Sequence, residues 1–308
     1  MERIYDTIVL GGGPAGYTAA LYAARAGLDT LVVERMSAGG QMALTGDVEN
    51  YPGFEEGIDG FTLGMKMQTG AERFGAQTEY AEVTGVSLKE RTKRIHTTAG
   101  TLLGKTVVIA TGANPRELGL QNEKSLVGRG VHYCAHCDGR FYKDKIVVVV
   151  GGGNSAASDA LYLSRLAKKV YLIHRRRTLR ATRVYHEPLM RAENVEFLWE
   201  GVVTELLTQD RVTGVRWRNV TTGEERELSV DGVFVSIGRK PATELLREEL
   251  PLDKNGYVLA DESTKTPLEG VFAAGDVRTK TLRQIVTAVA DGAVAAHMAE
   301  EYLSHLTD

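Results

Sequence analysis

Cysteine is scarce in this chain: its 308 residues include only two, Cys134 and Cys137. Long apolar runs are lacking as well, since the longest strand-like run is Ile146–Val150, far below the ~20 residues that span a bilayer. The N-terminus leads directly into a strand pattern and has no signal-peptide core, so we expect a cytoplasmic protein. In that reducing compartment, two cysteines three positions apart indicate a catalytic, redox-active or metal-binding site and not a structural crosslink.

The chain also lacks an excess of charge of either sign. Lys and Arg number 37 against 40 Asp and Glu, for a formal net charge of -3. Nothing in this balance suggests nucleic acid or an anionic membrane as a partner. With 43% hydrophobic and 25% charged residues, the composition is that of an ordinary soluble globular protein. A length of 308 residues predicts about two domains, each able to bury its own core.

Glycine, by contrast, is plentiful, with 34 residues, and two glycine-rich turns stand out. Thr7–Leu10 reads as a buried parallel strand, and the turn Gly11–Gly16, GGGPAG, follows at once. An alanine-rich helical pattern comes next, and a second strand, Thr30–Val33, ends in Glu34. This β–α–β pattern predicts a pyrophosphate bound at the helix N-terminus, with Glu34 accepting hydrogen bonds from a ribose.

The same arrangement returns 140 residues later, since 151 − 11 = 140. The strand is Ile146–Val150, the turn Gly151–Ala156 reads GGGNSA, and a helix at Ser155–Leu166 and a strand at Val170–Ile173 follow. A single glycine-rich turn can be a tight turn without any ligand. Two copies in matched contexts favour a nucleotide at each.

The residue at the end of the second strand differs between the two copies. The position equivalent to Glu34 is His174, which begins the basic run His174–Arg177, with Arg180 beyond it. A carboxylate would repel a ribose 2′-phosphate, whereas each guanidinium can bind it through a charge-assisted hydrogen bond of ~1.5–3 kcal/mol. The first copy is therefore predicted to bind an adenosine with a free ribose, as in FAD or NAD, and the second to bind NADP.

The two copies also end alike. Later strands are expected at Val107–Ala110 and Val233–Ser236, and each is followed by a Gly-x-x-Pro segment, Gly112–Pro115 and Gly238–Pro241. Each segment should end its strand and start a connection. We therefore predict a domain of residues 117–243 inserted into a domain of residues 1–116 and 244–308, with a pair of short strands between them as a hinge.

The C-terminal part supports this arrangement. Gly270–Asp276 reads as a short buried strand that ends in an acid, and Leu282–His297 is rich in Ala and Val at helical spacing. We expect this helix to direct its N-terminus toward a cofactor in the first domain. The cysteine pair lies between the two glycine-rich turns, which suggests that electrons pass from one nucleotide, through a second, to a dithiol.

With these segments placed, the chain resembles bacterial low-molecular-weight thioredoxin reductases over its full length. The distinguishing segment is Cys134–Gly139, CAHCDG, directly before the second nucleotide turn, because related disulfide reductases carry their cysteines near the N-terminus. The other matching segments are GGGPAG, Gly39–Gln41, Val48–Gly53, Ala110–Gly112, GGGNSA, His174–Arg180 and GVFAAGD. The resemblance implies an α/β fold of two Rossmann-like, three-layer nucleotide-binding domains, with the NADPH domain inserted into the FAD domain.

The resemblance also implies two cofactors and a set of contacts for each. The residues implied for FAD are Gly11, Gly13, Pro14, Ala15, Gly16, Glu34, Gly40, Gln41, Asn50, Ala110, Thr111, Gly112, Asp276, Arg283, Gln284 and Ile285. The residues implied for NADPH are Gly152, Gly153, Asn154, Ser155, His174, Arg175, Arg176, Arg180, Ile237 and Gly238.

The family's chemistry implies a role for each residue of the redox pair. Cys137 faces the flavin, Cys134 attacks the disulfide of thioredoxin, and Asp138 takes up and releases a proton during exchange. Hydride moves from NADPH to FAD and the electrons then pass to the disulfide, while the NADPH domain rotates between the half-reactions. The family is homodimeric, so we expect a homodimer whose protein partner is thioredoxin.

Two positions depart from the family pattern. His136 stands between the cysteines where threonine is usual; as a cation it can favour a neighbouring thiolate, or it can be a tolerated loop residue. Asp159 and the serines near it replace a more acidic helix after GGGN, which leaves contacts on the nicotinamide side open.

Other functions remain open at this point. A ferredoxin-driven flavin reductase or a small-molecule dithiol oxidase can share the scaffold but typically lacks an intact NADPH site, and the reductase of a peroxide-reducing system carries an extension for which this chain has no room. A metal-binding module would take its ligands from His132, Cys134, His136, Cys137 and Asp138, although seven residues rarely complete a zinc tetrahedron. A nucleotide sensor that uses the cysteines as a switch is a further alternative, and we expect no metal.

Overall fold

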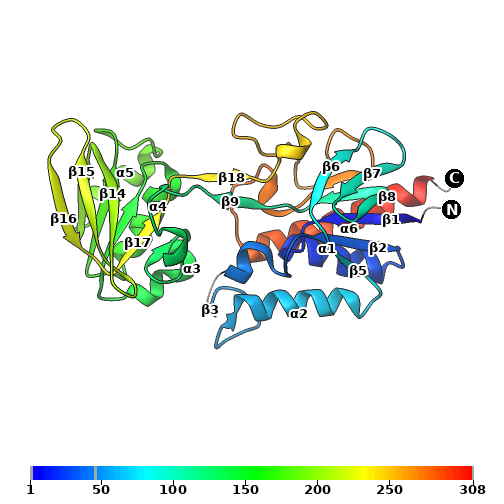
Figure 1. Cartoon of the computed structure of the whole chain (residues 1–308), viewed down its shortest axis with the longest axis horizontal. Helices are drawn as coiled ribbons and strands as arrows, with labels where there is room; N and C mark the ends of the chain where they lie inside the picture. The colour runs from blue at the N-terminus through cyan, green and yellow to red at the C-terminus, as the bar shows by residue number, and fades with distance from the viewer. Residues whose placement is uncertain (1–2, 45–46, 307–308) are drawn as a thin grey trace. The chain divides into compact units, whose positions relative to one another are not determined.

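The chain forms two compact α/β units, each with a parallel sheet at its centre (Figure 1). The computed structural model describes residues 3–44 and 47–306, so the ends of the expected first domain, residues 1–2 and 307–308, lie outside the described residues. The units are Met1–Asn114 with Lys240–Asp308, here called the outer unit, and Pro115–Arg239, here called the inserted unit. The α/β class and the parallel sheets predicted from the sequence are confirmed.

In the outer unit, four parallel strands in the order β5-β2-β1-β8 continue into the antiparallel strands β7 and β6, while β19 pairs in parallel with β8. Helices α1, α2 and α6 lie along this sheet, with α1 in contact with the other two. The strands are β1 (Ile4–Leu10), β2 (Thr30–Glu34), β3 (Asp47–Val48), β4 (Ile58–Asp59), β5 (Gln77–Tyr80), β6 (Val83–Ser87), β7 (Lys93–Thr97), β8 (Gly100–Ile109) and β19 (Val271–Ala273). The helices are α1 (Pro14–Arg25), α2 (Gly60–Glu72) and α6 (Ile285–Leu306).

In the inserted unit, five parallel strands in the order β10-β17-β11-β12-β13 form the central sheet, and β14, β15 and β16 form an antiparallel sheet. The strands are β10 (Val131–His132), β11 (Ile146–Val150), β12 (Lys169–His174), β13 (Val195–Trp199), β14 (Gly201–Thr208), β15 (Val212–Asn219), β16 (Glu225–Ser229) and β17 (Gly232–Val235). The helices are α3 (Ala135–Asp138), α4 (Asn154–Ser164) and α5 (His186–Arg191). The two expected connections are the short strands β9 (Ala113–Pro115) and β18 (Arg239–Pro241), which pair with each other.

Each central sheet is buried on both faces, which explains why its strands read as nearly continuous apolar runs. Along β11, Val147 and Val149 pack into one apolar cluster with α4, while Val148 and Val150 pack into a second cluster with β14 and β15. Side chains alternate across a strand, so a run of valines supplies both layers. In β1 the same alternation places Ile8 in one apolar cluster and Val9 in another, on the opposite face of the sheet.

The internal repeat inferred from the sequence is present as structure. Helix α1 begins at Pro14 and α4 at Asn154, so the helices keep the spacing of 154 − 14 = 140 residues. The expected C-terminal helix is displaced, because it begins at Ile285 and continues to Leu306 instead of ending at His297. Its last turns are polar on the exposed side, but Ala299 and Leu303 still pack on the sheet and extend the helix.

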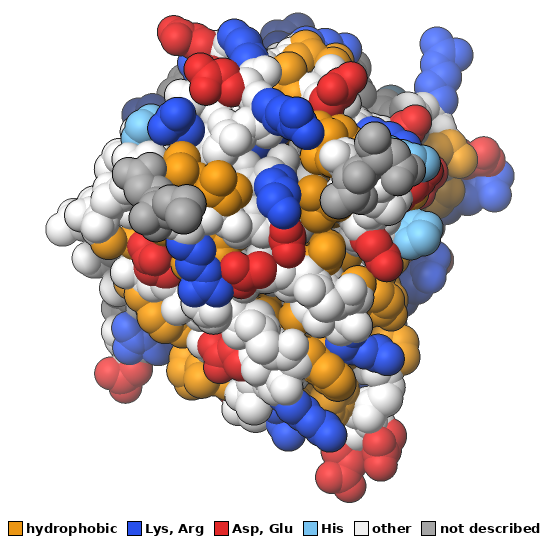
Figure 2. All heavy atoms as spheres, turned by 90° about the vertical axis from the view of Figure 1, so that its right-hand side faces the viewer, with side chains coloured by type: hydrophobic (Ala, Val, Ile, Leu, Met, Phe, Trp, Pro, Cys, Tyr) orange, Lys and Arg blue, Asp and Glu red, His pale blue; other side chains and the backbone are white. Residues whose placement is uncertain are grey.

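The described part of the chain contains no helix long and apolar enough to cross a membrane. On the face drawn in Figure 2, acidic and basic side chains are interspersed with apolar ones, as the near-balanced composition leads one to expect.

Helices α1 and α6 approach each other closely at Gly292. A Cβ atom at this position would lie 2.3 Å from the carbonyl oxygen of Ala15 and 3.0 Å from the backbone nitrogen of Ala19. Backbone atoms cannot move aside as a flexible side chain can, so only glycine fits between the helices here.

We expect Gly292→Ala to lower the free energy of unfolding by about 1–3 kcal/mol, the usual cost of overpacking. Gly70→Ala is the matched control, because Gly70 lies inside α2 and its Cβ position has no atom within 4 Å. The control should gain about 0.5–1 kcal/mol, since alanine loses less conformational freedom in a helix. Urea unfolding followed by near-ultraviolet circular dichroism measures both, and a loss of stability in Gly70→Ala equal to that in Gly292→Ala would contradict the close contact.

Candidate functional site

Cys134 and Cys137 form a disulfide in the inserted unit, with their Cα atoms 5.3 Å apart. The geometry follows from a single helical turn: Cys134 is extended and precedes α3, and its carbonyl oxygen accepts hydrogen bonds from the N–H groups of Cys137, at 3.3 Å, and Asp138, at 3.1 Å. Both cysteines are half-buried. A disulfide whose two sulfurs come from one turn can open and close without a change of fold.

The polar residues around the disulfide face two different carboxylates. His132 Nδ1 lies 3.0 Å from Asp138 Oδ2, whereas His136 Nδ1 lies 3.7 Å from Asp159 Oδ1. In residues 3–44 and 47–306, no group of three or more His, Cys, Asp or Glu side chains is arranged to hold a metal ion. The five ligands considered for a metal module are therefore divided between a disulfide and two separate contacts.

The second glycine-rich turn is shaped by a close backbone approach. A Cβ atom on Gly151, whose φ is +150°, would lie 2.4 Å from the carbonyl oxygen of Ser236, while the Cβ position of Gly153 is open. Helix α4 starts after Gly153 with no side-chain cap and no acidic residue in its first turn. The unsatisfied N–H groups and the positive end of the helix dipole suit an anion such as a pyrophosphate.

His174 and the arginines lie beside this turn. The His174 ring packs on Gly152, whose Cβ position lies 2.3 Å from the ring, and the N–H of Arg180 donates to Gly152 O at 2.7 Å. Burial, and then the charges of Arg180 and Arg176, lower the pKa of His174 below its ordinary value. Its Nε2 is buried and has no hydrogen-bond partner among the described residues. Arg175, like Arg176 and Arg180, is exposed.

The remaining residues predicted for this site are near the same turn. Asn154 Oδ1 accepts a hydrogen bond of 2.8 Å from Thr182 N, which ties the start of α4 to the segment after β12. Ser155 is exposed in the first turn of α4, and Ile237 and Gly238 are exposed just after β17. Since β17 lies next to β11, these residues follow neighbouring strand ends.

The first glycine-rich turn repeats this design in the outer unit. A Cβ atom on Gly16 would lie 1.8 Å from Gly11 O, and one on Gly11 would lie 2.6 Å from Ala110 O. Glu34 Oε2 accepts a 2.7 Å hydrogen bond from Gly12 N, so the acid at the end of β2 is fixed beside the turn. Pro14 is the first residue of α1, which likewise has no side-chain cap.

The other residues predicted for the outer unit form local pairs. The Cβ position of Gly40 lies 3.4 Å from Gly13 Cα, which places Gly40 directly beside the turn. Four hydrogen bonds then involve predicted residues: Gln41 Nε2 to Asn114 Oδ1 at 2.9 Å, Asn50 Nδ2 to Gln284 Oε1 at 3.1 Å, Thr111 Oγ1 to Ala242 O at 2.8 Å, and Arg283 Nε to Asp276 O at 3.3 Å. Ala15 is buried in α1, Gly112 follows β8, and Ile285 begins α6.

Comparison with known proteins identifies the family of the chain. Residues 5–292 match the model of the pyridine nucleotide-disulphide oxidoreductase family. The chain belongs to this family. It is 45% identical over 308 residues to a thioredoxin reductase of Listeria innocua, covering 100% of this chain and 96% of the relative, and 46% identical over 311 residues to one of Streptomyces coelicolor, covering 100% and 97%. Among solved structures, the thioredoxin reductase of Streptococcus pyogenes is 42% identical, covers 99% of this chain and 100% of its own, and has a TM-score of 0.91.

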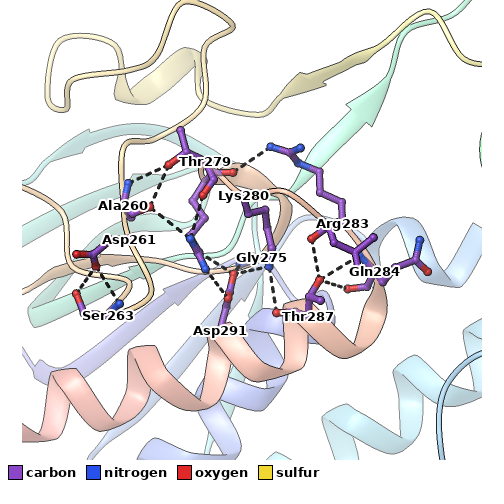
Figure 3. Close-up of polar contacts among 12 residues, drawn as sticks. Ala260, Asp261, Ser263, Gly275, Thr279, Lys280, Arg283, Gln284, Thr287 and Asp291 are labelled. Carbon is purple, nitrogen blue, oxygen red and sulfur yellow. Dashed lines mark hydrogen bonds and ion pairs between the residues drawn. The ribbon is translucent and has the colours of Figure 1, made fainter. Parts of the chain in front are cut away.

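A buried charged cluster in the outer unit was not predicted from the sequence. Asp291 in α6 accepts hydrogen bonds of 2.8 Å from Arg278 Nε and Nη2, from Lys280 Nζ and from Gly275 N (Figure 3). The three charged side chains are only 3–8% exposed. The one sequence feature that could have indicated this cluster is Asp291, an acid beside Gly292 in an otherwise Ala- and Val-rich helix.

This cluster holds together the segment that carries Asp276, Arg283 and Gln284. Burial alone would raise the pKa of Asp291, but the hydrogen bonds from Arg278, Lys280 and Gly275 N outweigh it and lower that pKa below its ordinary value. A carboxyl group whose pKa is lowered by folding contributes stability above its unfolded pKa, near 4, and loses it as the pH falls through the folded value.

We expect Asp291→Asn to lower the free energy of unfolding at pH 7 by about 3–5 kcal/mol, because it leaves two buried cations without an anion. The difference from the unchanged protein should shrink as the pH falls below about 4. The matched control is Asp29→Asn: Arg3 and Asp29 form an ion pair of 2.7 Å whose side chains are 52% and 37% exposed. Solvent screens such an exposed pair, so Asp29→Asn should lower the free energy of unfolding far less than Asp291→Asn does. Urea unfolding at several pH values tests this, and equal losses in both variants would refute a special role for the buried cluster.

Proposed function

We propose that this chain is an NADPH-dependent thioredoxin-disulfide reductase in which Cys134 and Cys137 alternate between a disulfide and a dithiol. The observation that carries the proposal is the disulfide formed by one helical turn in the same unit as the second nucleotide turn. The names of the relatives support the substrate, since those cited above are thioredoxin reductases.

FAD is the group that suits the outer unit. The glycine turn, the uncapped start of α1 and the fixed carboxylate of Glu34 fit a pyrophosphate followed by a ribose with a free 2′-hydroxyl. We infer that Gly11–Gly16, Glu34, Gly40–Gln41, Asn50, Ala110–Gly112, Asp276 and Arg283–Ile285 hold it. When bound, the flavin supplies the two-electron chemistry that links a nicotinamide to a disulfide.

NADPH is the group that suits the inserted unit. The exposed guanidinium groups of Arg175, Arg176 and Arg180 lie beside His174, close to the open turn at Gly153. Their charge fits a 2′-phosphate, which supports NADPH over NADH and argues against a ferredoxin-driven enzyme that lacks such a site. We infer that Gly152–Ser155, His174–Arg176, Arg180 and Ile237–Gly238 form the NADPH site.

Disulfide exchange requires a thiolate and a balanced movement of protons. We infer that Cys134 Sγ attacks one sulfur of the thioredoxin disulfide and that Cys137 Sγ then closes the internal disulfide and releases the reduced partner. The attacking thiol loses a proton and the departing sulfur gains one. Asp138, which follows Cys137 in α3, is suited to carry that proton between them.

The arrangement of the motifs also supports a rotation between the half-reactions. The disulfide and the NADPH turn belong to one unit, and both must reach one flavin on the other unit. Only two chain connections join the units, so we infer that the inserted unit turns about them. A homodimer and a cytoplasmic location, which the family resemblance implies, remain predictions.

We expect Cys134→Ser and Cys137→Ser each to abolish NADPH-driven thioredoxin reduction, because either change removes the disulfide that transfers electrons. Both variants should remain yellow and should still reduce ferricyanide, which does not need the cysteines. An anaerobic NADPH titration gives the readout, because the unchanged protein should take up two electrons more than either variant. Full thioredoxin reduction by either serine variant would eliminate the proposed function.

Nucleotide choice supplies a second test. Arg176→Ala should raise KM for NADPH about 10- to 100-fold and leave KM for NADH nearly unchanged, because a charge-assisted bond to the 2′-phosphate is lost. Arg177→Ala is the matched control, since Arg177 is paired with Glu200 at 2.9 Å and is not among the residues proposed to bind the phosphate. Steady-state kinetics with both coenzymes measures the ratio, and an equal effect in the two variants would argue against this phosphate site.

A further inference from the structure

A buried histidine connects the proposed acid–base residue to the core of the inserted unit. His132, on β10, is 6% exposed, and its Nδ1 lies 3.0 Å from Asp138 Oδ2. Its other ring nitrogen, Nε2, lies 2.7 Å from the hydroxyl of Tyr142. Three groups from three segments are therefore connected, Tyr142 to His132 by a hydrogen bond and His132 to Asp138 by a 3.0 Å polar contact, and the series ends at the carboxylate next to Cys137.

The ring of His132 is held in place by packing. It stacks on Phe234 of β17, with ring centroids 5.2 Å apart, and meets Tyr142 edge-on at 5.1 Å. Phe234 and Tyr142 are 0% and 2% exposed. The Cβ position of Gly232 lies 2.3 Å from the Tyr142 ring, so this ring packs directly on the backbone of β17. A ring enclosed in this way keeps one orientation.

The partners of the two nitrogens fix the tautomer. Burial raises the pKa of Tyr142, although Arg211 opposes this, so the hydroxyl keeps its proton and can donate to Nε2. Nε2 then accepts, and Nδ1 carries the ring hydrogen, 3.0 Å from Asp138 Oδ2. The titratable groups that face this chain are Asp138 on the Nδ1 side and Tyr142 on the Nε2 side, with Arg211 and Asp231 acting on Tyr142.

We propose that His132 is a positioning residue which, oriented by Tyr142, holds Asp138 Oδ2 through the contact of its Nδ1 and leaves Oδ1 to carry the exchanged proton. The 3.0 Å contact of His132 Nδ1 is made to Oδ2. The proton from the attacking thiol moves to Oδ1 as the new S–S bond forms. It moves on to the departing sulfur, which keeps the electron pair of the broken bond. This inference rests on the proposed role of Asp138.

The test follows the reaction of the cysteine pair alone. The full-length protein is reduced with dithiothreitol, freed of reductant and mixed anaerobically with 5,5′-dithiobis(2-nitrobenzoate) over a range of pH. This assay needs neither NADPH nor thioredoxin. The part of the pH profile that disappears in Asp138→Asn reports the carboxylate.

We expect His132→Leu to move the midpoint of that part to higher pH, because Asp138 Oδ2 loses its polar contact with Nδ1. His132→Asn should stay close to the unchanged protein, since its amide N–H stands near the position of Nδ1. Tyr142→Phe should shift the midpoint in the same direction by less, because it acts through the imidazole. His136→Leu is the matched control and should not move the midpoint, because the carboxylate that lies near His136 is that of Asp159.

Several results would overturn the proposal. A lower rate at every pH with an unmoved midpoint in His132→Leu would give His132 a purely structural role. Equal shifts in His132→Leu and His132→Asn would show that the N–H donor is not what matters. If the pH profile of Asp138→Asn were the same as that of the unchanged protein, neither Asp138 nor His132 would have its proposed role. Failure of the unchanged protein to reduce thioredoxin with NADPH would instead count against the proposed function, while the dithiol assay would still decide the role of His132.

Discussion

Close backbone packing at the two glycine-rich turns is the constraint on which the rest of the structure depends. In the outer unit the start of α1 leaves no space for a side chain at Gly16, which lies against the carbonyl of Gly11. In the inserted unit a Cβ atom on Gly151 would lie 2.4 Å from Ser236 O, which is also too close for a side chain. Because each helix starts so close to its strand, its uncapped N-terminus faces the same sheet edge as the residues at the ends of neighbouring strands. Glu34 and His174 reach their turns for this reason.

Much of this arrangement could be predicted because it depends on local patterns in the amino-acid sequence. Strands buried on both faces, such as Ile146–Val150, have to be apolar throughout, and the glycines are required where backbone approaches backbone. The spacing of 140 residues relates both turns and both helices, so finding one copy located the other. The antiparallel strands were not predicted. Glu225–Ser229, for example, is almost wholly exposed and pairs with β15 through the backbone and the ion pair of Glu227 with Arg216, so it carries no apolar alternation.

The side-chain networks could not be read from the sequence, since their members come from separate segments. His132 precedes the cysteines by two residues and reads equally well as a metal ligand, and only the packing of Phe234 and Tyr142 around it shows that it turns toward Asp138. Arg278 and Asp291 are thirteen residues apart and meet because α6 folds back under the loop before it. Such pairs are selected by tertiary packing, and a pattern along one strand or helix does not record them.

The residue at the end of the second strand has a structural task in addition to its proposed role in nucleotide binding. Gly12 and Gly152 are equivalent, since 152 − 12 = 140, and each is covered by that residue: Glu34 accepts a hydrogen bond from Gly12 N, whereas the His174 ring packs on Gly152. Replacing His174 by an acid would introduce a charge that repels a 2′-phosphate, and it would also remove the ring that fills the space above the turn. At the proposed NADPH site, nucleotide choice is therefore coupled to the packing of the turn. The exposed arginines that follow His174 can be replaced by uncharged residues without disturbing the strand–turn–helix unit.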